Sequence, residues 1–303
     1  MPAVRAGAAS IDPAGRFVEL GSAGRVRALR DGLVLVGLLF LGYLFAVVAP
    51  QVATVGFDAF SYWNIDPAQP YAISTGHLGA FPYSPVLLRA FSLAGGLSWP
   101  AFWWLWTAVL VATAAWLGGR RWWLAVFAFP PVASELYHGN LNLLIAAGIA
   151  LGFRYPAAWA FVLLSKVTPG VGLVWFAVRR EWRSLAVALG VAGAIAAASL
   201  LLDADLWRQW LDQQLVVSLR DPIDQSQIAI PLLLRLPVAA VIVAWGGLTN
   251  RRWTVPLAAA LALPVLWFSG FAILAAIPAI ARAELAPRPD RTAPAVPLAA
   301  AAR

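Results

Sequence analysis

A single carboxylate, Asp58, is the side chain in this sequence best placed to do chemistry. It lies in the aromatic segment Val55-Gly-Phe-Asp-Ala-Phe-Ser-Tyr-Trp63, directly after the first apolar run of membrane length. A carboxylate at a membrane surface, among aromatic residues and away from basic clusters, is poorly explained by packing. Asp58 could remove a proton from a hydroxyl, bind a cation or a sugar, or pair with a distant arginine. A partly apolar setting would raise its pKa toward working pH, as a general base requires.

Further polar side chains stand at the ends of apolar runs or inside them. The segment His138-Gly-Asn-Leu-Asn142 opens one such run, where Asn140 could cap a helix or the amides and imidazole could bind sugar hydroxyls. Arg89 and Arg235 each lie in apolar sequence, and their guanidinium groups could reach the headgroups or bind a lipid phosphate. Lys166, the only lysine, interrupts an apolar run, where a charge is costly and usually has a role.

The composition of the chain is that of an integral membrane protein. Its 303 residues are 61% hydrophobic and 12% charged, with a mean hydropathy of +0.76, whereas soluble domains carry about 25% charged residues. The absence of cysteine excludes disulfides, thiolate metal sites and cysteine nucleophiles. The net charge of +8 comes from arginines grouped at the ends of apolar runs, which indicates cytoplasmic flanks and no nucleic-acid partner.

The charge distribution predicts a multi-pass protein of the plasma membrane with both termini in the cytoplasm. Residues 1–30 form an arginine-bearing tail, residues 31–282 one membrane domain, and residues 283–303 a disordered tail rich in proline and alanine. The acidic residues gather in two segments predicted to be external loops, at about 50–97 and 203–227. The first membrane helix is expected to be uncleaved.

Two apolar runs have arginines at both ends. Both ends should therefore lie in the cytoplasm, whereas a helix that crosses the membrane once has its ends on opposite sides. Arginines precede and follow residues 156–178, and Thr168-Pro169-Gly170 interrupts that run. We predict a hairpin of two short or partly re-entrant helices with Lys166 near its tip, which is tolerated when the tip lines a wet cavity. A single kinked helix with Lys166 buried halfway is the alternative.

The second such run is residues 253–281, which Pro264 and Gly270 interrupt. A second short hairpin there would keep both termini inside. The predicted fold is thus an all-α polytopic bundle of about 10 transmembrane or short re-entrant helices with external loops.

An ordered set of motifs carries a resemblance to a known family. The motifs are FDAFSYW (57–63), FPYSPVLL (81–88), HGNLN (138–142), LLSKVTPG (163–170), RREWR (179–183) and DQSQ (224–227). Together they resemble the polytopic alpha-mannosyltransferases of glycosyltransferase family 87, which have the GT-C architecture. The likeness is to actinobacterial members that extend phosphatidylinositol mannosides and lipomannan, and it covers about residues 30–280.

The resemblance implies an activity and a set of roles. Such enzymes take a sugar from a polyprenyl monophosphate on the periplasmic side, without a nucleotide sugar, metal or other cofactor. Asp58 matches the catalytic base of the family, Gly139 and Asn142 its Gly-x-x-Asn element, and Lys166, Thr168 and Pro169 its Lys-x-Thr-Pro element. The residues assigned to the donor phosphate are Lys166, Arg235, His138 and Arg89, and those assigned to the sugar or acceptor are Tyr62, Asn140, Asn142 and Gln225.

The chain departs from the family in one motif. Relatives often carry a Trp-x-His-His near the last helices, whereas the segment Leu263-Pro264-Val-Leu-Trp267-Phe-Ser269 has no histidine. If that histidine binds the donor phosphate in relatives, then His138, Lys166 or Arg235 must do so here, or activity has been lost.

The expected reaction is an inverting transfer of mannose to a hydroxyl of a glycolipid or lipoglycan at the outer face of the membrane. One base suffices because the leaving phosphate monoester needs no proton, unlike the two carboxylates of glycoside hydrolysis. Mannose rests on the resemblance alone, since arabinose and glucose donors use the same architecture. A transporter or flippase of a lipid-linked sugar, built from broken helices, is the alternative from another class. A non-catalytic subunit of an envelope-synthesis complex is the third hypothesis.

Overall fold

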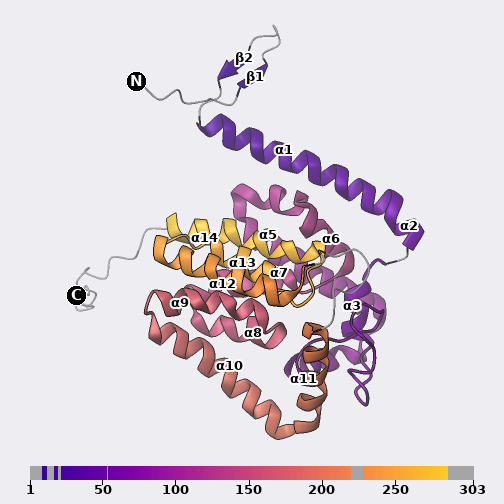
Figure 1. Ribbon diagram of the computed structural model, residues 1–303. Helices are drawn as coiled ribbons and strands as arrows, with labels where there is room; N and C mark the ends of the chain where they lie inside the picture. The colour runs from indigo at the N-terminus through magenta and orange to yellow at the C-terminus, as the bar shows by residue number, and fades with distance from the viewer. Residues whose placement is uncertain are drawn as a thin grey trace, which may run out of the picture.

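The computed structural model describes residues 9–11, 17–19, 22–52, 54–219, 228 and 230–285. This part of the chain is helical (Figure 1), apart from a small antiparallel pair of strands, β1 (Ala9–Ile11) and β2 (Phe17–Glu19). The prediction of an all-α polytopic membrane protein is confirmed. Among the described residues, five helices are long and apolar enough to cross a membrane: Gly24–Val52, Trp99–Ala128, Trp182–Leu202, Leu232–Thr249 and Phe268–Leu285.

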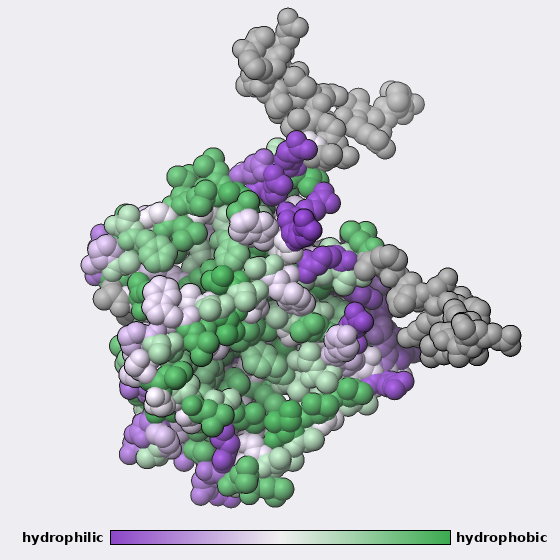
Figure 2. Space-filling model, turned by 180° about the vertical axis from the view of Figure 1, so that it is seen from behind, coloured by the Kyte–Doolittle hydropathy of each residue, from purple (hydrophilic) through white to green (hydrophobic). Residues whose placement is uncertain are grey.

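The first long helix runs along one side of the bundle (Figure 1). It comprises α1 (Ser22–Tyr43), η1 (Leu44–Val48) and α2 (Ala49–Val52). The helix thus begins inside the segment that the sequence predicted as a tail. Most of its leucines are exposed, as expected where lipid rather than protein covers the surface, and Figure 2 shows apolar residues over much of the back of the molecule.

The centre of the bundle is formed by α5 (Trp99–Ala128), α6 (Pro130–His138) and α7 (Asn142–Gly152). Helix α5 is interrupted at Gly119, whose φ of 57° is readily adopted only by glycine. The neighbouring Gly118 lies against the backbone of Trp123. The chain therefore turns at this point, just before Arg120 and Arg121.

The first predicted hairpin is present. Helix α8 (Trp159–Ser165) ends at Lys166, which has extended backbone, and η4 (Thr168–Leu173) and α9 (Val174–Val178) follow. The ring of Trp159, at the start of α8, packs on Gly172 and Phe176. The two arms are therefore antiparallel with Lys166 at the tip, and the single kinked helix is wrong.

The second predicted hairpin is also present. Its arms are α13 (Thr254–Leu261), then η5 (Phe268–Ala275) and α14 (Ala276–Leu285). Gly270 packs against Leu263 across the turn. Pro264 lies in the second break itself, whereas Pro169, Gly170 and Gly270 lie in the first turns of the helices that follow the two breaks.

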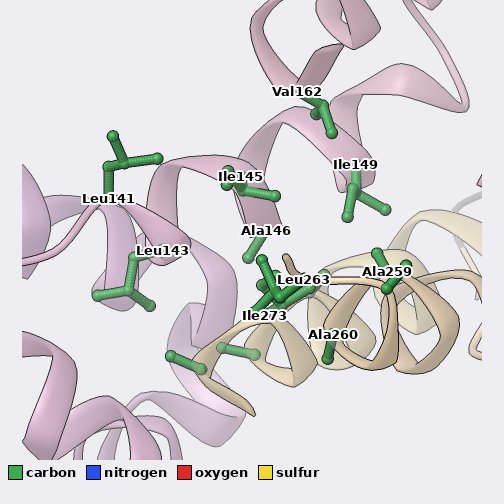
Figure 3. Packing of buried hydrophobic residues seen from close by; sticks show 14 of the residues in the cluster. Leu141, Leu143, Ile145, Ala146, Ile149, Val162, Ala259, Ala260, Leu263 and Ile273 are labelled. Atoms are coloured by element: carbon green, nitrogen blue, oxygen red, sulfur yellow. The ribbon is translucent and has the colours of Figure 1, made fainter. Parts of the chain in front are cut away.

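The hydrophobic core lies between α7 and the second hairpin (Figure 3). Ala146 of α7 faces Leu263 and Ile273 of the hairpin, and all three side chains are almost completely buried. Alanines on α13 allow the backbones to approach closely, which is how helices associate in membranes. Helix α12 (Leu232–Thr249) packs in the same way, because Gly246 lies directly against Thr254.

One predicted external loop is a helix over most of its length. Helix α10 (Trp182–Leu202) ends at Asp203, and α11 (Ala204–Leu219) leaves it at an angle (Figure 1). The carboxylate of Asp203 accepts a hydrogen bond from the N–H of Leu206 at 3.1 Å, as an N-cap does. Trp210 is buried, and its indole N–H donates to the carbonyl of Pro82. This docking and the cap explain why the aspartate-rich segment is helical.

The arginines of separate turns meet at one end of the bundle. Arg282 donates to the carbonyl of Trp116, and Arg179 donates to the carbonyl of Gly247. Arg252 lies over the ring of Phe153. These contacts join the interruption of α5 near Gly119 to the ends of α7, α9, α12 and α14, so one end of the bundle carries the cationic turns, as the charge distribution predicted.

Candidate active site

A cavity of about 440 Å³ opens among α3 (Phe57–Trp63), the loop before α4 (Pro85–Ser92), α6 and the tips of both hairpins. Its lining mixes carboxylate, imidazole, amide, ammonium and hydroxyl groups with aromatic rings. The polar side chains in the lining are Thr54, Asp58, Ser61, Tyr62, Thr75, His77, Tyr83, Ser134, His138, Asn140, Ser165, Lys166 and Ser269.

Asp58 lies in the first turn of α3 and faces this cavity. The helix begins after Gly56, which has a φ of 75° and donates its N–H to the carbonyl of Tyr137. One carboxylate oxygen of Asp58 accepts a hydrogen bond from the amide of Asn140 at 2.9 Å. Burial raises the pKa of Asp58, while His138, the Asn140 bond and Lys166 act in the opposite direction. Within the described residues, no arginine forms an ion pair with it.

The HGNLN motif forms the turn between α6 and α7. Gly139 has a φ of 73° and lies directly against Ala59 of α3, so a larger residue would push α3 away. The carbonyl oxygen of the Asn140 side chain accepts the N–H of Leu141 at 2.7 Å. This bond directs the amide NH₂ of Asn140 at Asp58, so the motif sets the orientation of the carboxylate.

Lys166 reaches the cavity from the tip of the first hairpin. Its ammonium donates a hydrogen bond to the side-chain oxygen of Asn142 at 2.8 Å, and lies 5.7 Å from the ring centroid of Tyr83. The amide NH₂ of Asn142 in turn donates to the carboxylate of Glu135 at 3.0 Å. Lys166 and His138 are the cationic or imidazole groups of the predicted phosphate set that line the cavity.

The hydroxyl groups of Tyr62 and Tyr83 form a hydrogen bond of 2.9 Å on the wall of the cavity. Tyr62 is nearly fully buried and stacks on Phe91 of α4. Tyr83 was not assigned a role from the sequence, although it stands in the FPYSPVLL motif. Ser61, Ser134 and the residues of the second hairpin tip were likewise missed, because their exposure to the cavity depends on contacts between distant segments.

Among the described residues of the predicted site, Arg235, Arg89 and Asn142 do not line this cavity, although Asn142 accepts a hydrogen bond from Lys166, which does. Arg235 is buried, and its guanidinium donates to the backbone carbonyls of Ile230, Leu261, Leu263 and Pro264. Its donors are thus directed at the base of the second hairpin tip instead of at a phosphate. Arg89 is exposed on α4. Gln225, like Asp224 and Ser226, lies outside the described residues.

The tip of the second hairpin, although far from Asp58 in the sequence, forms another wall of the cavity. Pro264, Val265, Trp267, Phe268 and Ser269 all line the cavity. The segment in which relatives carry Trp-x-His-His therefore faces the same space as Asp58 and Lys166.

Comparison with known protein families identifies the class of the chain. Residues 81–300, well over half of its length, match glycosyltransferase family 87. The chain belongs to this family and is a membrane-embedded glycosyltransferase. Asp58 lies ahead of the matched residues. No curated protein and no solved structure matches the chain.

Proposed function

We propose that this protein transfers mannose from a polyprenyl monophosphate donor to a hydroxyl of a glycolipid or lipoglycan, with inversion at the sugar carbon. The observation that carries the proposal is the convergence on one cavity of Asp58, hydrogen-bonded by Asn140, with Lys166 and His138. A carboxylate can act as the base, and the ammonium of Lys166 stabilises the leaving phosphate. The acceptor is a glycolipid or lipoglycan of the phosphatidylinositol mannoside or lipomannan type.

The reaction needs one proton transfer. Asp58 takes the proton of the acceptor hydroxyl as the oxygen attacks C1 of the sugar. The bond between C1 and the phosphate oxygen breaks, and polyprenyl phosphate leaves without protonation. The raised pKa of Asp58 makes the carboxylate a stronger base than an exposed aspartate, and the ammonium of Lys166 offsets the charge on the leaving group.

The cavity lies at the end of the bundle away from the arginine-bearing turns. Arginine-rich turns face the cytoplasm in most membrane proteins, so we assign the cavity to the external face of the plasma membrane and both termini to the cytoplasm. A transporter would need a site near the middle of the bilayer between related halves. A cavity at one end, lined by a base and a cation, favours transfer chemistry.

Asp58→Asn tests the proposal. The asparagine keeps the size of the side chain but cannot accept the proton, so kcat should fall on the order of 10²- to 10⁴-fold while the protein still folds and inserts. The measurement is incorporation of radiolabelled mannose from polyprenyl-phosphate mannose into lipid by the purified protein. Asp66→Asn, an exposed carboxylate outside the cavity, is the matched control. Near-normal turnover in Asp58→Asn would refute the role of this base.

The pH dependence gives a second test of the same group. Only the ionised carboxylate accepts the proton, so the rate should fall as pH drops through the pKa of Asp58. Because burial raises that pKa above 3.8, the acidic limb of kcat should lie above the ordinary aspartate range. An acidic limb that is unchanged in a slow Asp58→Asn variant would show that another group titrates.

A further inference from the structure

Glu135 is a fully buried carboxylate beside the cavity that the proposed reaction does not use. It stands in α6 with no exposed surface. One oxygen accepts the amide NH₂ of Asn142 at 3.0 Å, and the other accepts the backbone N–H of Leu143 at 3.2 Å. A buried carboxylate is costly unless its charge is compensated.

The compensating charge is Lys166, which Asn142 joins to Glu135. Since Glu135 takes the NH₂ group of Asn142, the oxygen of that amide must point the other way, where it accepts the ammonium of Lys166 at 2.8 Å. The amide thus cannot turn without placing two donors or two acceptors face to face. The remaining N–H groups of the ammonium are left for the cavity and for the ring of Tyr83.

We propose that Glu135 is a positioning residue that keeps Lys166 protonated and aims it, through Asn142, at the phosphate of the lipid-linked donor. The part of this inference that concerns the donor rests on the proposed function. The charge linkage between Glu135 and Lys166 does not depend on it.

Glu135 and Lys166 form a buried pair whose charges act on each other: burial raises the pKa of Glu135 to about 8, and the charge of Lys166 is the leading effect in the opposite direction. Lys166 lies between the two arms of its hairpin, outside both helices, and burial lowers the pKa of its amine. Glu135 of α6 and, more weakly, Asp58 of α3 act in the opposite direction. His138 faces Asp58 from the same helix as Glu135. The carboxylate that raises the pKa of Lys166 most is therefore Glu135, which is joined to Lys166 through Asn142.

The sequence offers a direct measurement, because Lys166 is the only lysine in the chain. An acylating reagent reacts only with the neutral amine, so its rate at Lys166 as a function of pH reports the pKa of that amine. Mass spectrometry of the labelled peptide gives the rate, and Lys166→Arg shows that the signal comes from this position. The wild-type protein should be acylated about tenfold or more slowly near pH 7 than near pH 9.

Glu135→Gln removes the charge and keeps the shape. We expect the acylation rate of Lys166 near pH 7 to rise about tenfold, which corresponds to a fall of about one unit in its pKa. Glu135→Asp keeps the charge and should retain a pKa close to that of the wild type, although the hydrogen bonds are displaced. A role in packing alone would affect both variants alike. Glu284→Gln, a carboxylate at the arginine end of the bundle, is the control and should leave the rate unchanged.

Transfer kinetics provide the second readout. In Glu135→Gln the ammonium is lost at a lower pH, so the basic limb of kcat/KM for the donor should move to lower pH. The inference is overturned if Lys166 is already neutral near pH 7 in the wild-type protein, or if Glu135→Gln and Glu135→Asp leave the same acylation profile. A wild-type protein that transfers no sugar from any polyprenyl-phosphate donor would refute the proposed function, and the acylation profile would still decide the linkage between the two residues.

Discussion

The tips of the two broken hairpins face the same cavity but contribute different chemistry to it. The first tip carries Lys166, whose ammonium points into the cavity and is held by Asn142. The second tip, from Pro264 to Ser269, presents aromatic and hydroxyl groups. The cation nearest to the second tip, Arg235, is turned away from the cavity toward backbone carbonyls.

The cause of the difference is how each break satisfies its free carbonyl groups. At the first tip, serine hydroxyl groups donate hydrogen bonds to these carbonyl groups. Ser84 donates to the carbonyl of Leu164, and Ser165 donates to the carbonyl of Val162. At the second tip the guanidinium of Arg235 does so. A buried carbonyl must find a donor, and a cation that supplies it is no longer available to a ligand. Among the described residues of the two tips, Lys166 alone presents a cation to the cavity.

Of the changes that compare the two tips, the largest expected effect is at the first tip. Lys166→Met removes the ammonium and should lower kcat/KM for the polyprenyl-phosphate donor by about 10²- to 10³-fold, the usual cost of losing one group that stabilises a leaving charge. Ser269→Ala, the matched change at the second tip, should cost only a few-fold. Equal losses in transfer assays of the two purified variants would show that the tips are not functionally different.

An intermediate effect is expected when the second tip loses its support. Arg235→Met leaves several buried carbonyls without donors, which should lower the free energy of unfolding by about 3 kcal/mol and Tm by several degrees. Thermal unfolding in detergent measures this loss, and Arg235→Lys should restore part of it. If Arg235 bound the donor phosphate directly, Arg235→Met would raise the donor KM without lowering Tm.

The smallest effects come from the glycines that let the arms of each hairpin approach. A methyl group on Gly172 would lie 2.3 Å from the ring of Trp159, which is buried and rigid, so Gly172→Ala should lower the free energy of unfolding by about 1–3 kcal/mol. A methyl group on Gly270 would meet the end of the flexible Leu263 side chain at 2.4 Å and should cost less than about 1 kcal/mol. Similar Tm values for the two variants would contradict this order.

Much of the fold could be predicted from residue types along the chain. The apolar runs predicted the membrane helices, and Pro169, Gly170, Pro264 and Gly270 predicted both hairpins. Within the segment 203–227, residues Ala204–Leu219 form a helix that the sequence did not predict, because Asp203 is an N-cap and the indole of Trp210 donates to the carbonyl of Pro82. Its aspartates were interpreted by charge alone. The disordered tail predicted at 283–303 lies almost wholly outside the described residues.

The candidate site could be predicted in part. The locations of Asp58, Tyr62, His138, Asn140, Asn142 and Lys166 agree with their assignment to one site, since each lines the cavity or hydrogen-bonds to a group that does. Their roles remain predictions. Arg89 and Arg235 were chosen because a guanidinium in apolar sequence suits a lipid phosphate. Sequence alone does not tell which acceptors surround a guanidinium, and for Arg235 these are carbonyls.

The sequence by itself determined that this chain spans a membrane, where its helices break and which end of the bundle gathers arginines, because hydropathy, proline and charge act locally or along one axis. Only the tertiary structure decided which polar groups meet. Asp58 and Asn140 are brought within 2.9 Å by the packing of Gly139 on Ala59, and Glu135 is joined to Lys166 by one amide. Such pairings depend on the distances between helices, which no local pattern encodes.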